Sequence, residues 1–195
     1  MRTVRKVLEE NQIPLMLAVF AVAVGFVIGM STHVTLPNEN RLEPPPIPST
    51  PTELFLQIFI TNSMIAVYSA LLGFGLFTAI YSIGEIYGLV YQLFPGKFII
   101  AMVTFGLLEL LAEIFAVTQS IILMKYVILK VLGEPVSFLK FLSNAMIVLL
   151  FSFATLIISA VLETALILAP PNLQTPVILL GGIITTLYVY TLLYE

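Results

Sequence analysis

The sequence contains no cysteine, no tryptophan and no aspartate, and only 10% of its 195 residues are charged. Without cysteine there are no disulfides and no thiolate metal sites, and without aspartate there is no aspartyl intramembrane protease. A water-soluble domain carries roughly 25% charged residues, so this chain has too few to cover a surface in water. Because 59% of its residues are hydrophobic, the composition predicts an integral membrane protein whose main partner is the lipid bilayer.

Motifs of several other protein classes are also missing. Only eight residues are Lys or Arg and the net charge is -3, which argues against a nucleic-acid partner. His33 is the single histidine, so the H-E-x-x-H pair of a zinc protease cannot occur, and no G-x-x-x-x-G-K-[ST] nucleotide loop is present. We therefore predict no catalytic activity, no metal and no cofactor.

The apolar residues form long segments separated by short polar stretches. Each segment must be helical, because only a helix satisfies its own backbone hydrogen bonds within lipid. The segment 54–94 is too long for one crossing and suits two, with a break near residues 72–75. One crossing followed by a re-entrant hairpin is the alternative. The other predicted helices cover residues 13–30, 98–132, 138–168 and 177–193.

The predicted fold is therefore an all-α, polytopic transmembrane helical bundle with about six membrane-crossing helices, or five plus a re-entrant hairpin. Residues 1–195 belong to a single integral membrane domain in this prediction. Residues 32–53 form a proline-rich linker between the first and second helices, and the prolines favour extended polyproline II. We expect a stiff extracytoplasmic spacer, with a docking strip for a partner as the alternative.

Basic residues indicate how the helices are oriented, because cytoplasmic loops collect Lys and Arg. With six crossings and the N-terminus inside, only Arg41 and Lys97 lie outside, whereas five crossings would divide the basic residues about evenly. The distribution predicts a multi-pass protein of the cell membrane with both termini cytoplasmic. The basic residues then placed on or near the inner side are Arg2, Arg5, Lys6, Lys125, Lys130 and Lys140.

Glycines four residues apart predict close helix contacts. Small residues let helix backbones approach in lipid, and G-x-x-x-G is a common form of such a contact. Gly25 and Gly29 form this motif in the first helix, and Gly84 and Gly88 form it in the third. We expect these motifs to pack helices within one chain, with dimerisation of two chains as the alternative. Further glycines assigned to helix packing are Gly73, Gly75 and Gly106.

Several ionisable residues lie inside the apolar segments, where they almost always face the bundle interior or a wet cavity. Glu109 and Glu113 are one helical turn apart and share a face. A buried carboxylate needs a cation or a proton, so we expect at least one of this pair to be neutral or bound to a cation. Neutral glutamates that only hold helices together by hydrogen bonds are the alternative. The full candidate polar or ion site is Asn62, Glu85, Glu109, Glu113 and Glu163.

These residues also resemble a known family. Asn62, the Gly73/Gly75 pair, Gly84-x-x-x-Gly88 and Gly106-Leu-Leu-Glu109 are similar to the stage II sporulation protein M family of integral membrane proteins. The resemblance covers about residues 54–168 and implies a multi-spanning bundle with a Gly/Glu helix contact. In that family a His-Gly-x-x-Glu motif opens the corresponding helix, and here Phe105 replaces the histidine. Members in sporulating bacteria anchor cell-wall-degrading enzymes at the septal membrane.

Two functions follow from these observations. The resemblance favours a membrane scaffold or assembly protein that holds membrane or cell-envelope proteins and forms a homo-oligomer, with a dimer favoured. The intramembrane polar residues favour a cation or proton channel or transporter. In that second hypothesis, the pathway is lined by Asn62, Glu85, Glu109 and Glu113.

Overall fold

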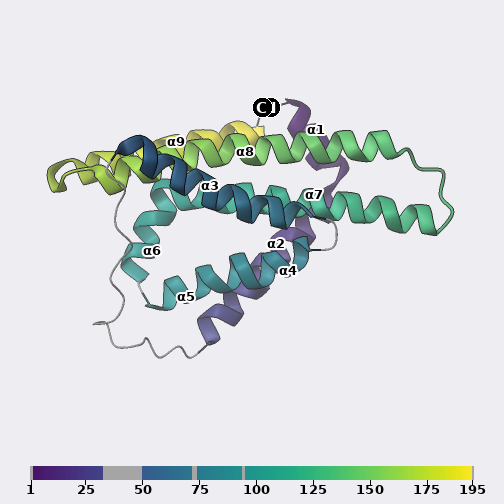
Figure 1. Ribbon diagram of the computed structural model, residues 1–195, viewed down its shortest axis with the longest axis horizontal. Coiled ribbons are helices and arrows are strands. Elements are labelled where there is room, and N and C mark those ends of the chain that lie inside the picture. Colours follow the sequence, from purple (N-terminus) through teal and green to yellow (C-terminus); the bar gives the residue numbers. More distant parts are fainter. Residues whose placement is uncertain (1, 33–49, 72–73, 94, 195) are drawn as a thin grey trace.

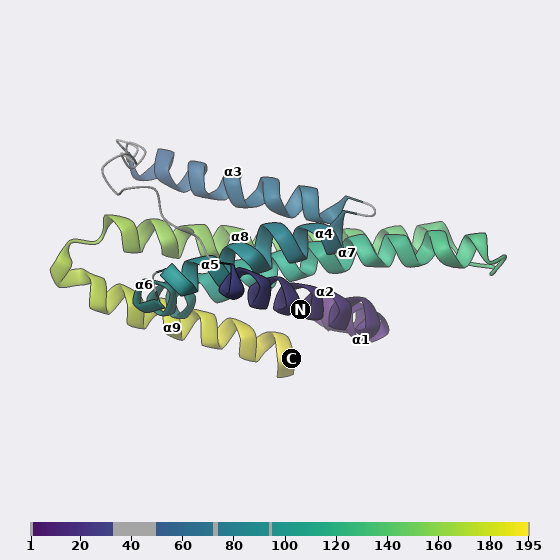
Figure 2. The ribbon, with the colours of Figure 1, turned by 90° about the horizontal axis from the view of Figure 1, so that it is seen from below.

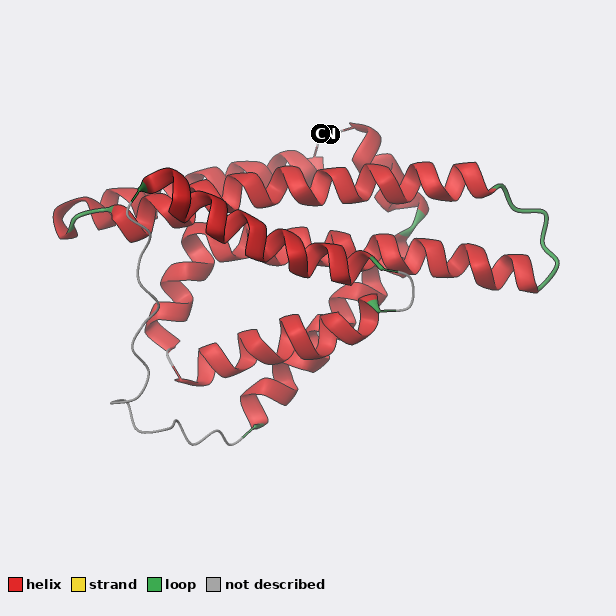
Figure 3. Ribbon diagram, viewed as in Figure 1, coloured by secondary structure: helices red, strands yellow, loops and turns green. Residues whose placement is uncertain are grey.

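The computed structural model describes residues 2–32, 50–71, 74–93 and 95–194. Within these ranges the chain forms helices joined by short turns and contains no strand (Figure 3), which confirms the predicted all-α bundle. The predicted linker lies largely outside the described residues, as does Gly73. The elements are α1 (Arg2–Glu10), α2 (Gln12–Ser31), α3 (Pro51–Ala70), α4 (Gly75–Thr78), η2 (Ala79–Gly84), α5 (Glu85–Leu93), α6 (Pro95–Ala101), η3 (Met102–Gly106), α7 (Leu107–Val131), α8 (Phe138–Leu168) and α9 (Pro171–Tyr194).

Two of these elements, η2 and η3, are π-helices within longer helices. The first joins α4 to α5, and the second joins α6 to α7. Successive long helices run back and forth along the molecule, and the two ends of the chain lie near each other (Figures 1 and 2). Figure 1 also shows that α6 leaves the line of α7 at η3 and turns toward α5. A π-helix is a recognised cause of such a bend.

Five helices in the described ranges are long and apolar enough to cross a membrane, so the chain is a helical membrane protein. The sixth predicted crossing, α4–η2–α5, is helical over residues 75–93 and packs along α2, but it is not one of these five. Its polar residues, including Ser82 and Glu85, lower its apolar content. The five are Gln12–Ser31, Pro51–Ala70, Pro95–Val131, Phe138–Leu168 and Pro171–Leu192.

Prolines account for two differences from the predicted helix boundaries. α3 begins at Pro51, inside the predicted linker, because Thr50 and Glu53 form a capping box with N–O distances of 3.2 and 3.3 Å. The linker prediction of 32–53 is therefore wrong at its C-terminal end. α9 begins at Pro171 and continues through Pro176, although the sequence predicts a start at residue 177. Proline at the first helical position loses no intrahelical hydrogen bond, which allows the earlier start.

The N-terminal helix α1 was not predicted as a separate element. Val4 and Val7 are buried, and Val7 packs against Phe115 of α7 and Ala145 of α8. Lys6, Glu9 and Glu10 lie on the exposed side of α1. The ion pair between Lys140 Nζ and the Glu10 carboxylate, at 3.9 Å, further links this region to the start of α8. α1 is therefore an amphipathic helix fastened to the bundle.

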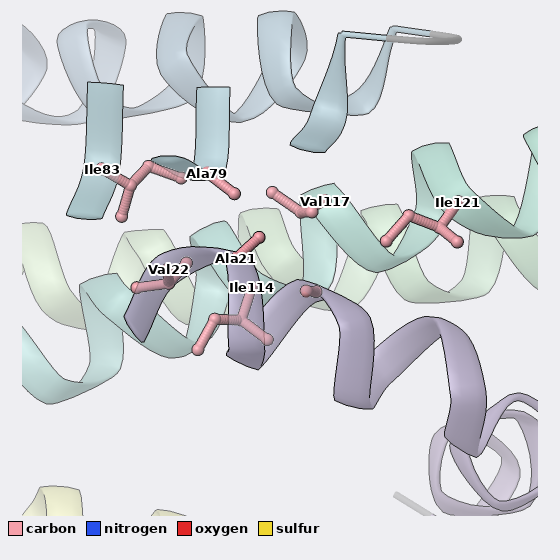
Figure 4. Packing of buried hydrophobic residues seen from close by; sticks show 8 residues of the cluster. Ala21, Val22, Ala79, Ile83, Ile114, Val117 and Ile121 are labelled. Carbon is pink, nitrogen blue, oxygen red and sulfur yellow. The ribbon is translucent and has the colours of Figure 1, made fainter. Parts of the chain in front are cut away.

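The two G-x-x-x-G motifs pack against each other within one chain. A methyl group built on Gly84 would come within 2.7 Å of the Gly25 Cα atom, and one built on Gly88 within 2.9 Å of the Gly29 Cα atom. Such distances leave no room for a side chain. Next to this contact, side chains of α2, η2 and α7 meet in one apolar cluster that includes Ala21 (Figure 4). The glycines thus bring α2 against η2 and α5.

Replacing Gly25 with alanine is expected to lower the free energy of unfolding by about 1–3 kcal/mol, because the added methyl group must displace the η2 backbone. Thermal unfolding of the purified protein in detergent, followed by circular dichroism, measures the change. Gly96→Ala is the matched control, since no described atom lies within 4 Å of a methyl group built there. Equal melting temperatures for the two variants would contradict the contact.

Candidate functional site

A cavity of about 450 Å³ lies in the corner between α5, α6 and α7, where the chain bends at η3. We call it the glutamate cavity, because Glu109 and Glu113 of α7 and Glu163 of α8 line it. Ile65 of α3 closes one side. Most of the wall is apolar. The polar and charged lining residues are Ser82, Tyr87, Lys97, Glu109, Glu113 and Glu163.

Glu113 is the most deeply buried of the three glutamates, with only 3% of its surface exposed. Neither of its carboxyl oxygens has a hydrogen-bond partner among the described residues. Ser69 of α3 lies close enough to interact with this carboxyl group, but the two form no hydrogen bond of ordinary geometry within the described chain. An ionised carboxylate in such a place costs several kcal/mol, so Glu113 needs a proton or an incoming cation.

Glu109 connects two walls of the glutamate cavity. The Tyr87 hydroxyl of α5 lies close enough to interact with the Glu109 carboxyl group. Glu163 approaches from α8 near enough for its charge to act on Glu109. Like charges at this depth oppose each other, because the low polarity of the surroundings screens them weakly. The three glutamates therefore favour the uptake of positive charge.

Both π-helices border the glutamate cavity. η2 contributes Ser82, and η3 contributes Phe105. The backbone of η3 is held by neighbouring helices: Ser159 of α8 donates to the Phe105 carbonyl at 3.2 Å, and Thr185 of α9 donates to the Thr104 carbonyl at 3.4 Å. Single π-helical turns occur frequently at functional sites. Here η3 lies at the bend beside the cavity, and η2 lines another part of its wall.

The structure brings together some of the predicted site residues and separates others. Glu109, Glu113 and Glu163 line the glutamate cavity, whereas Asn62 and Glu85 are not among its lining residues within the described ranges. The backbone of Glu85 instead contacts Gly29.

The other predicted packing glycines also differ in role. A methyl group on Gly75 would come within 2.7 Å of the Ser120 Cβ atom of α7, which places Gly75 at a helix contact. The nearest neighbours of a methyl group on Gly106 belong to Met102 and Ala101 of the same helix. Gly106 lines the glutamate cavity, so its small size leaves space there rather than bringing two helices together.

Sequence reasoning missed Tyr87, Lys97 and Phe98 as lining residues. Tyr87 comes directly before Gly88, the second glycine of the Gly84-x-x-x-Gly88 motif. No other feature of the sequence points to Tyr87. Phe105, where the resembling family has histidine, also lines the cavity. Within the described ranges, no three His, Cys, Asp or Glu side chains come close enough together to hold a metal ion.

Comparisons with models of known protein families, with curated proteins and with solved structures find no match to this chain. The similarity to the stage II sporulation protein M family stays a prediction from the sequence.

Replacing Glu113 with glutamine is expected to change the free energy of unfolding by less than about 1 kcal/mol, because glutamine keeps the shape of a protonated glutamic acid and carries no charge. Chemical unfolding in detergent measures the difference, with Glu134→Gln in the exposed α7–α8 turn as the control. A loss of about 3–5 kcal/mol would instead mean that Glu113 is ionised and paired.

Proposed function

We propose that this protein is a membrane transport protein, a channel or a carrier, that takes a proton or a cation into the glutamate cavity and passes it across the bilayer. The observation that carries the proposal is Glu113, which is 3% exposed, lines the cavity and has no hydrogen-bond partner for either carboxyl oxygen in the described chain. Ionisable groups at membrane depth commonly mark ion or proton paths.

Packing alone would not require this arrangement. Hydroxyl groups already join the helices: Ser152 donates to the Ala112 carbonyl and Ser120 donates to the Leu71 carbonyl, both at 2.7 Å. A glutamate retained to hold helices together would be expected to use its oxygens in the same way. The unpartnered oxygens of Glu113 support a group that exchanges its proton or cation.

The extent of the glutamate cavity supports access from one membrane surface. Its lining reaches from Lys97, an exposed residue near the start of α6, to the buried Glu113 in the second turn of α7. The wall of one cavity therefore includes both an exposed residue and a deeply buried glutamate.

Charge distribution supports an orientation for this pathway. Lys130 and Lys140 lie at the α7–α8 turn, at the opposite end of the molecule from the α5–α6 turn (Figure 1). We infer that the α7–α8 turn and both termini face the cytoplasm of a cell membrane, because basic residues gather on that side. The glutamate cavity then opens toward the extracytoplasmic side.

Purified protein in liposomes with an entrapped pH-sensitive dye tests the proposal. An imposed membrane potential is expected to drive proton movement through wild-type protein, and Glu113→Gln and Glu109→Gln should each reduce the rate at least tenfold, because they remove the exchangeable charge. Glu134→Gln, in the exposed turn, should retain the wild-type rate.

The absence of proton or cation movement above that of empty liposomes would contradict the proposal. Equal rates for wild type and Glu113→Gln would also contradict it. Either result would favour the scaffold hypothesis, in which the homo-oligomer and the envelope partners remain predictions from the sequence.

A further inference from the structure

The wall of the glutamate cavity combines carboxyl groups with aromatic rings. Tyr87, Phe98 and Phe105 all line it. The Tyr87 and Phe98 rings meet edge to face with their centroids 6.1 Å apart. Phe98 also contacts Tyr91 at 5.4 Å and Phe26 at 6.2 Å. Phe98 is therefore held in place by neighbouring rings from α2 and α5.

The size of the glutamate cavity exceeds what a bare ion requires. A water molecule occupies about 30 Å³ of liquid volume, whereas the cavity measures about 450 Å³. Sites for small organic molecules range over about 300–1,000 Å³ and combine apolar walls with a few polar groups. The lack of a three-ligand metal group in the described ranges also favours a larger ligand than a dehydrated metal ion.

The charge of the site selects the ligand class. Glu109, Glu113 and Glu163 supply negative charge, and Tyr87 is the titratable group that faces them from α5. Lys97 also lines the cavity, from α6 on the far side of η3, so the wall holds three carboxyl groups and one amino group. Ammonium groups are attracted both to carboxylates and to the faces of aromatic rings.

We propose that the glutamate cavity binds an organic ammonium ion, with its charged nitrogen beside Glu109 and Glu163 and its apolar part along Tyr87, Phe98 and Phe105. This inference rests on the proposed transport function and names its substrate class. The same chemistry occurs in a free amine and in the amino headgroup of phosphatidylethanolamine, and the experiment separates these two sources.

Equilibrium dialysis of the full-length protein in detergent with radiolabelled benzyltrimethylammonium tests the inference. Wild-type protein should bind this cation at least tenfold more tightly than benzyl alcohol, which has the ring without the charge. Excess sodium chloride should not displace the bound cation when samples are compared at the same total ionic strength. Glu109→Gln should weaken binding at least tenfold, whereas Glu134→Gln should bind as wild type does.

The tyrosine provides a second, independent variant. Tyr87→Phe keeps the ring and should keep most of the affinity, whereas Tyr87→Leu removes it and should weaken binding severalfold because a cation–π contact is lost.

In nanodiscs of phosphatidylglycerol, added phosphatidylethanolamine should weaken probe binding by competition if the natural ligand is a lipid headgroup. It should leave binding unchanged if the ligand is a free amine.

Failure of this inference can be distinguished from failure of the proposed function. Proton movement that depends on Glu113, together with no binding of benzyltrimethylammonium by wild-type protein, would overturn the ligand class and leave the transport proposal standing. Equal affinity for benzyltrimethylammonium and benzyl alcohol would also overturn the ligand class. The wild-type comparison decides this even if Glu109→Gln does not fold.

Discussion

The central constraint on this protein is the burial of the middle of α7 on all sides. Every residue from 112 to 122 is buried, so a polar side chain in this stretch is surrounded by neighbouring helices. Glu113 lies within it, beside a cavity rather than beside a hydrogen-bond donor. A carboxyl group held in this way must take a proton or a cation, and the arrangement of the surrounding helices determines which of these can reach it.

The helices around α7 are held together by hydrogen bonds from serine side chains and by close backbone contacts at glycines. Ser152 and Ser120 donate to backbone carbonyls of neighbouring segments, while glycines allow α2 to lie directly against η2 and α5. In lipid, close van der Waals packing and interhelical hydrogen bonds replace the hydrophobic force as the source of helix association. These contacts join the helices without using the carboxyl oxygens of Glu113.

The π-helix η3 links this packing to the proposed site. It turns α6 away from α7 and toward α5, and hydroxyl groups of α8 and α9 hold its carbonyls. The cavity lies in the resulting corner, with carboxyl groups on α7 and α8 and aromatic rings on α5 and α6. A straight helix from Pro95 to Val131 would lie away from α5 along its first turns and would close no such space. The bend at η3 therefore places α6 in the wall of the cavity.

The sequence by itself determined that the chain lies in lipid, that it is helical, and where most helices begin and end. Long apolar segments must be helical in lipid, because a helix satisfies its own backbone hydrogen bonds. The sequence also determined that Glu109 and Glu113 share a face, since helical spacing alone places them one turn apart. Only the tertiary structure decided that Glu163, 50 residues beyond Glu113 in the chain, joins them and that Asn62 and Glu85 do not. Helical periodicity describes one helix at a time, whereas a shared cavity depends on the rotation, register and bending of several helices against one another.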